Sequence, residues 1–172
     1  MKLNLGCGLN RLKGYVNVDR EGEADVLLDL ESSPWPWPDN LAEEVQLIHV
    51  LEHIGQDPAV FIGFMKELYR VCKPHAKVNI RVPHPRHDDF LNDPTHVRPV
   101  TPEVLGLFSL ANCERWKASG ASNSPLGLHH GINFELIAKR FVLEPRYREM
   151  LNSGEMDSQA KATPVSPRQD SS

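Results

Sequence analysis

Two features near the amino terminus have the residue types of a ligand-binding turn. Residues 3–8 read Leu-Asn-Leu-Gly-Cys-Gly, a short apolar run that opens into a turn with Gly6 and Gly8. Because glycine lacks a Cβ, a ligand can lie directly against such a backbone. Asp19 ends a second apolar run eleven residues after Gly8, where a carboxylate can accept both hydroxyls of a ribose. A dinucleotide fingerprint would carry a third glycine where Arg11 stands, so the pattern favours a single nucleoside.

Histidines in the middle of the chain form a second group of candidate residues. Residues 49–53 read His-Val-Leu-Glu-His, the H-x-x-E-H spacing that holds zinc in some metalloproteases when it lies on a helix. Here the apolar residues around it favour a strand that ends within the motif. Residues 84–96 contain three further histidines and three aspartates, which suit either a divalent metal or a solvated loop. We expect no metal site and place this loop beside a substrate.

Strand-like and helix-like segments alternate along the chain. The expected strands are residues 2–5, 15–18, 25–28, 45–50, 77–82 and 133–143. Asp57-Pro58 begins an amphipathic helix that ends at Lys73-Pro74, and Thr101 begins a shorter helix that reaches about Ser109. The nearly continuous apolar run 45–50 is typical of a central strand buried on both faces. This order predicts an α/β fold with a mostly parallel sheet and helices on both faces.

Composition excludes several classes of protein. The 172 residues carry a formal net charge of −4, which disfavours nucleic acid as a partner. No apolar run approaches the about 20 residues of a membrane helix, so we expect a cytoplasmic protein without a membrane partner. Three distant cysteines fit reduced thiols. Residues 151–172 are polar and are expected to be disordered, which leaves one domain over residues 1–150.

Residues 1–109 together resemble the class I S-adenosylmethionine-dependent methyltransferases, specifically their short bacterial members. The resemblance rests on six ordered matches: the glycine turn, Asp19, Asp29-Leu30, and residues 36–40, 49–53 and 68–74. It implies a Rossmann-like three-layer sandwich with S-adenosyl-L-methionine as cofactor. The positions that it assigns to cofactor binding are Asn4, Gly6, Cys7, Gly8, Asp19, Arg20, Asp29, Leu30, His49 and Leu51.

The chain also departs from the family pattern. The family often carries an acid at Asn4, so the contact to the cofactor amino group is made differently or is weaker, and often a glycine at Asn10. Residues 9–15 leave hardly one helical turn between strands that normally need a dozen connecting residues. We therefore expect the first crossover helix to be vestigial.

The resemblance implies methyl transfer to a small polar, possibly sugar-like, acceptor. His53 and His84 follow the fourth and fifth strands and are the candidate general bases, because histidine titrates near neutral pH. His87, His96 and Arg98 are candidates for substrate binding. Two alternatives stay open: a non-catalytic S-adenosylmethionine-binding module, and a metal-dependent hydrolase that uses the His/Asp loop. An apolar late strand at a sheet edge would also allow a homodimer.

Overall fold

The computed structural model describes residues 1–142, 148–149 and 152–153. Met1–Ile137 form one compact unit, and the residues from Ala138 onward belong to a second unit. The expected domain end at residue 150 and nearly all of the tail 151–172 lie outside the described residues. No helix in the described part is long and apolar enough to cross a membrane.

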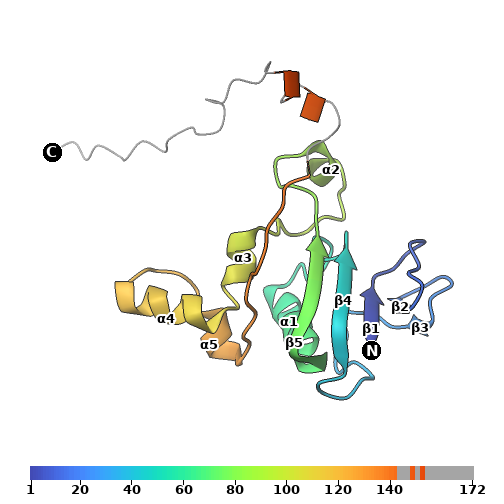
Figure 1. Cartoon of the computed structure of the whole chain (residues 1–172), viewed down its shortest axis with the longest axis horizontal. Helices are drawn as coiled ribbons and strands as arrows, with labels where there is room; N and C mark the ends of the chain where they lie inside the picture. Colours follow the sequence, from blue (N-terminus) through green and yellow to red (C-terminus); the bar gives the residue numbers. More distant parts are fainter. Residues whose placement is uncertain (143–147, 150–151, 154–172) are drawn as a thin grey trace. The chain divides into compact units, whose positions relative to one another are not determined.

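Five parallel strands in the order β3-β2-β1-β4-β5 form the sheet of the first unit (Figure 1). Their bounds are β1 Lys2–Leu5, β2 Val16–Asp19, β3 Val26–Leu27, β4 Ala42–Ile48 and β5 Cys72–Arg81. The helices are α1 Pro58–Val71, α2 Asp88–Leu91, α3 Pro102–Gly106, α4 Leu110–Ser119 and α5 Leu126–His130. The prediction of an α/β fold with a parallel sheet is confirmed. The link from β1 to β2 contains no helix, as expected from its length.

The sheet has one apolar face, and α1 packs against it. Two rows of side chains in register form this face: Val16, Leu3, Val45 and Val78 in one row, and Val18, Leu5, Leu47 and Ile80 in the other. Helix α1 buries Phe61, Phe64, Met65, Leu68 and Val71 on the side that meets this core. Asp57 caps the helix by accepting a hydrogen bond from the Ala59 N–H at 2.8 Å, which confirms the predicted start.

The opposite face of the sheet is polar, which corrects the expectation that β4 is buried on both faces. Register places Asn17, Asn4, Gln46 and Asn79 in one row across it, and Lys2, Glu44 and Lys77 in the next. Lys2 and Tyr15 both bond the Glu44 carboxylate, at 2.8 and 2.6 Å, and the Lys2 hydrogen bond contributes most to lowering the pKa of that carboxyl.

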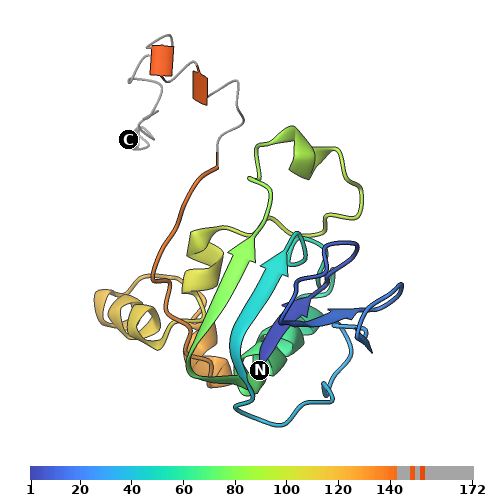
Figure 2. The same cartoon turned by 45° about the vertical axis from the view of Figure 1, so that its right-hand side comes forward.

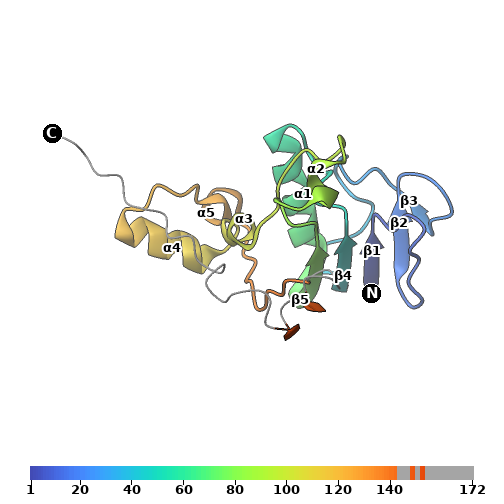
Figure 3. The same cartoon turned by 90° about the horizontal axis from the view of Figure 1, so that it is seen from above.

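Within the unit Met1–Ile137, no helix covers this polar face (Figure 3). The expectation of helices on both faces therefore differs from the structure, because the polar residues of β4 and β5 alternate with apolar ones and leave a second helix nothing apolar to bury.

A buried carboxylate joins α1 to the loop before β4. Glu67 accepts hydrogen bonds from the Trp35 N–H at 2.6 Å and from the Arg70 guanidinium at 2.7 and 3.0 Å. The Arg70 hydrogen bond is the main cause that lowers the pKa of Glu67, and burial opposes it. Arg70 also donates to the Trp37 carbonyl and to Asp39. Trp35 is buried in the core, and Trp37 packs edge-on against it.

Residues 133–142 form no strand, so the prediction of a late strand over 133–143 is wrong for its described part; Leu143 lies outside it. An amphipathic strand must bury alternate residues. Here the consecutive pairs Leu136-Ile137 and Phe141-Val142 are all exposed. The suggested homodimer relied on pairing through this late strand, and residues 133–142 do not form it.

Two helices that the sequence did not predict follow α3. Ser109 caps α4, and Gly120 ends it with a φ of 69°. Helices α3, α4 and α5 lie beyond β5 (Figure 1). Phe108, just after α3, packs against Phe61 of α1 with ring centroids 6.1 Å apart.

The turn before α1 depends on Gly55. Its φ is 68°, and an added Cβ would lie 2.5 Å from the Phe61 nitrogen. Gly120 has a φ of 69° with open space around it. We expect Gly55→Ala to lower the free energy of unfolding by about 3 kcal/mol or more, and Gly120→Ala by about 1 kcal/mol, because only Gly55→Ala adds a backbone clash to the left-handed strain. Equilibrium unfolding in urea measures both losses, and equal losses would contradict this account.

Candidate functional site

The glycine turn after β1 packs closely against Val50, a residue of the loop that follows β4. Gly6 has a φ of 66°, and a Cβ there would lie 2.6 Å from Cγ2 of Val50. The position therefore requires glycine for both its backbone conformation and this close approach. Gly8 also has a positive φ, 48°, but open space surrounds it. The turn thus presents bare backbone at the carboxyl ends of β1 and β4.

Cys7 lies between these glycines and points into the protein. Its side chain is buried, its N–H donates to the Val18 carbonyl at 3.0 Å, and burial raises the pKa of its thiol. A buried thiol with a raised pKa is a poor nucleophile. Cys7 therefore contributes backbone to the turn.

Asp19 ends β2 beside this turn. Its Oδ2 accepts a hydrogen bond from the Gly8 N–H, and its Oδ1 accepts one from the Arg20 N–H, both at 2.8 Å. These bonds fix the carboxylate, while each oxygen keeps a further lone pair for a ligand hydroxyl. The structure thus brings together the glycine turn and the acid that the sequence identifies.

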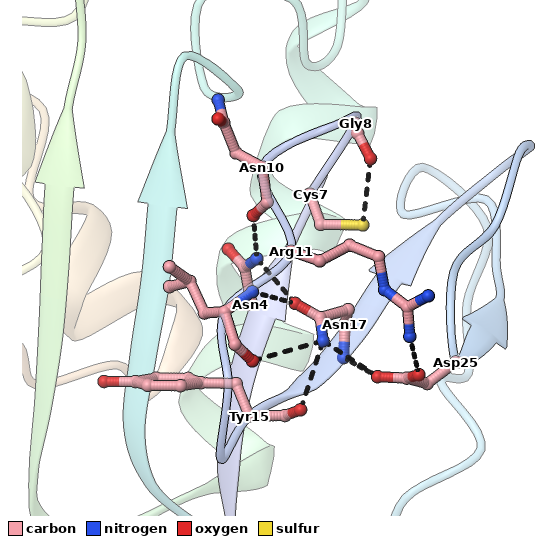
Figure 4. Close-up of polar contacts among 9 residues, drawn as sticks. Asn4, Cys7, Gly8, Asn10, Arg11, Tyr15, Asn17 and Asp25 are labelled. Atoms are coloured by element: carbon pink, nitrogen blue, oxygen red, sulfur yellow. Dashed lines mark hydrogen bonds and ion pairs between the residues drawn. The ribbon is translucent and has the colours of Figure 1, made fainter.

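Asn17 holds the helix-free link between β1 and β2 (Figure 4). Its Oδ1 accepts hydrogen bonds from Asn4 Nδ2 at 2.9 Å and from the Leu12 N–H at 2.7 Å. Its Nδ2 donates to Asp25 Oδ2 at 2.9 Å. Asn4 also donates to the Asn10 carbonyl at 2.9 Å, so its amide N–H groups hold the loop. Asn17 belongs to no motif, so only its place in a strand beside a short link could have suggested this role.

The remaining expected cofactor residues lie on the loops after β3 and β4. Asp29 is exposed and bonds the Glu31 N–H and the Ser32 hydroxyl, while Leu30 is buried in the core. His49 follows β4 with a φ of 57° and a half-exposed side chain. Leu51 is fully buried, so its side chain packs in the core and leaves only backbone for a ligand.

The histidine-rich loops follow β4 and β5 at this same end of the sheet (Figure 2). The structure brings His53 and His96 together, with ring centroids 4.6 Å apart. His84 and His87 instead accept bonds from backbone N–H groups two residues onward, and His87 thereby caps α2. The Arg98 guanidinium stacks 4.4 Å above the Phe61 ring and donates to the Gly55 carbonyl, so it supports the turn before α1.

Glu52 is the residue of this region that the sequence did not select. Its side chain is fully buried, and neither carboxylate oxygen has a hydrogen-bond partner in the described part of the chain. Residues 49–54 form no helix, so His49 and His53 do not share a helix face as the metalloprotease arrangement requires. The H-x-x-E-H pattern was the one signal for Glu52.

No protein-family model matches this sequence, and no curated protein matches it. Among solved structures, the chain is similar to a SAM-dependent methyltransferase from Archaeoglobus fulgidus, with a TM-score of 0.51 and 22% sequence identity. The match covers 90% of this chain and 77% of the other. At this identity the likeness shows a shared fold, and it confirms the expected Rossmann-like α/β class.

Replacing Asn17 tests whether its side chain holds the link. We expect Asn17→Ala to lower the free energy of unfolding by about 2 kcal/mol or more, because it leaves one N–H of the buried Asn4 amide and the Leu12 N–H without an acceptor. Asn79 lies in the same row of the sheet but is exposed, so Asn79→Ala is the matched control and should cost under about 0.5 kcal/mol. Urea unfolding measures both variants. Equal losses would contradict the role given to Asn17.

Proposed function

We propose that this chain binds S-adenosylmethionine at the carboxyl ends of β1, β2 and β4 and transfers its methyl group to a small polar acceptor. The observation that carries the proposal is the Asp19 carboxylate, held by the Gly8 and Arg20 N–H groups beside a bare glycine turn. The fold shared with a protein named a SAM-dependent methyltransferase supports the same conclusion.

The residues present fit a nucleoside with a charged amino-acid extension. Asp19 offers acceptor lone pairs to the two ribose hydroxyls. The open space around Gly8 admits the sulfur-bearing chain against the backbone. Asp29, Leu30 and His49 follow the neighbouring strands and would flank the adenine. Asn4 uses its amide N–H groups internally, which leaves its Oδ1 as the side-chain acceptor for the cofactor amino group.

The reaction needs alignment more than a strong catalytic group. Bound S-adenosylmethionine supplies an electrophilic methyl on a sulfonium, and its sulfur leaves as a neutral thioether, so the leaving group needs no proton. The loops after β4 and β5 would hold the acceptor in line with that methyl and exclude water. A hydroxyl or ammonium acceptor must also lose a proton to a base. His53 and His84 are the candidates, and His87 and His96 would contact the acceptor.

Calorimetric titration with S-adenosylhomocysteine tests this site. We expect micromolar binding to the wild type and at least about tenfold weaker binding to Asp19→Ala, because hydrogen bonds to a charged group contribute about 1.5–3 kcal/mol. Glu23 is an exposed acid in the following loop, and Glu23→Ala should bind like the wild type. Unfolding midpoints confirm that both variants are folded.

Three outcomes separate the alternatives. No binding by the wild type, or equal binding by Asp19→Ala, contradicts the proposed site. Binding without methyl transfer to a panel of small polar acceptors identifies the chain as a binding module. Hydrolysis that a chelator abolishes would favour a hydrolase.

A further inference from the structure

A buried carboxylate that accepts no hydrogen bond from the described residues lies next to two imidazoles. Glu52 is fully buried, and neither of its oxygens accepts a hydrogen bond from the described residues. An ionised carboxylate in such a place is costly unless a cation compensates it. His49 Nδ1 lies 3.3 Å from Glu52 Oε1, but the two atoms lack hydrogen-bond geometry. The described protein groups therefore leave both Glu52 oxygens without a hydrogen bond, and a bound ligand could supply the missing contact.

His53 and His96 complete a set of three possible metal ligands with Glu52. One ligand atom from each residue lies within 4.8 Å of the other two. The His96 side chain is 7% exposed, so its position is fixed by packing. A carboxylate with two imidazoles is a donor set that holds divalent transition metals and leaves coordination positions open.

Hydrogen bonds around both imidazoles orient them for coordination. His96 Nδ1 lies 2.9 Å from the Phe90 carbonyl, which only accepts, so Nδ1 carries the proton and Nε2 keeps its lone pair. Thr95 donates its hydroxyl proton to Asp93 at 2.6 Å. The Thr95 oxygen, 3.0 Å from His53 Nδ1, must then accept the His53 proton, which leaves His53 Nε2 free to coordinate. Such outer hydrogen bonds fix the tautomers of metal-binding histidines.

A second carboxylate lies beside the imidazole pair. Asp93 Oδ2 lies 3.7 Å from His96 Nε2. The Thr95 hydroxyl and N–H both donate to Asp93 Oδ1, at 2.6 and 2.8 Å, and hold this carboxylate in place. Two carboxylates, Glu52 and Asp93, thus face the imidazole pair and favour a bound cation.

We propose that Glu52, His53 and His96 bind one divalent transition-metal ion, of the class of Zn²⁺ or Co²⁺, with His49 and Asp93 beside it. Three protein ligands leave at least one position for water or for an oxygen of a bound molecule. This proposal differs from the expectation that the chain has no metal site. It is independent of the proposed cofactor site, because it rests on groups other than the glycine turn and Asp19. A metal bound by His53 and His96 would leave His84 as the candidate base and His87 as the acceptor contact.

Metal binding to the full chain tests the proposal. After chelation and dialysis, we expect the wild type to take up about one equivalent of Zn²⁺ or Co²⁺ per chain. Glu52→Gln keeps the shape of the side chain but removes its charge, and it should bind at least about tenfold more weakly, as should His96→Ala. His129 is an exposed histidine on α5, and His129→Ala should bind like the wild type.

Two further measurements distinguish loss of the metal site from a folding defect and from metal binding by cysteine. Zn²⁺ should raise the unfolding midpoint of the wild type and of His129→Ala, but not that of either ligand variant. The Co²⁺ spectrum should lack a thiolate charge-transfer band, which excludes the three cysteines as ligands. Retained S-adenosylhomocysteine binding in Glu52→Gln would show that it is folded and that the two sites are separable.

Three results would overturn the metal site. They are failure of the wild type to bind either ion, a thiolate band in the Co²⁺ spectrum, and unchanged metal binding by both Glu52→Gln and His96→Ala. Loss of S-adenosylhomocysteine binding by the wild type with metal uptake intact would contradict only the proposed function.

Discussion

The hydrogen bonds of the buried Asn17 side chain allow β1 and β2 to lie parallel with only residues 6–15 between them. A connecting helix would normally cover the sheet and satisfy its own backbone. Here Asn17 joins Asn4, Leu12 and Asp25 from three segments. The glycine turn, the position of Gly8 against Asp19, and the polar second face of the sheet all depend on this substitution of a side chain for a helix.

Two groups of residues with different chemistry meet the carboxyl edge of this sheet. At β1 and β2 the chain offers bare backbone and an oriented carboxylate, which suit a nucleoside. After β4 and β5 it offers a buried glutamate and two oriented imidazoles, which suit a cation. Ligands of open α/β sheets bind beyond the carboxyl ends of strands. Both proposed sites therefore lie at the same edge of the sheet.

Local signals predicted the parts of the fold that local interactions determine. The limits of β1, the Asp57 cap of α1 and the Thr101 cap of α3 follow from residue types within one turn or strand. The apolar run at β4 misled because Gln46 and His49 look like interruptions until register places Gln46 in a polar row with Asn4 and Asn79. Helix α4 escaped notice because only Cys113 of its residues is buried, so it lacks an apolar stripe.

The candidate site divides in the same way. Gly6, Gly8 and Asp19 were found from spacing along one strand-turn-strand segment, and the structure places them together. The pairing of His53 with His96, and the isolation of the Glu52 carboxylate, depend on contacts between distant loops. A single sequence does not reveal such contacts. Glu52 was overlooked because residues 49–53 were interpreted as the end of a strand.

The most direct test of the central claim is chemical-shift mapping of the ¹⁵N-labelled chain as S-adenosylhomocysteine is added. If the cofactor binds at the glycine turn, the amide signals of Gly6, Gly8, Asp19 and Arg20 shift together with one saturating dependence, while those of α5 stay unchanged. Absence of shifts at the glycine turn, or shifts confined to other segments, would contradict it.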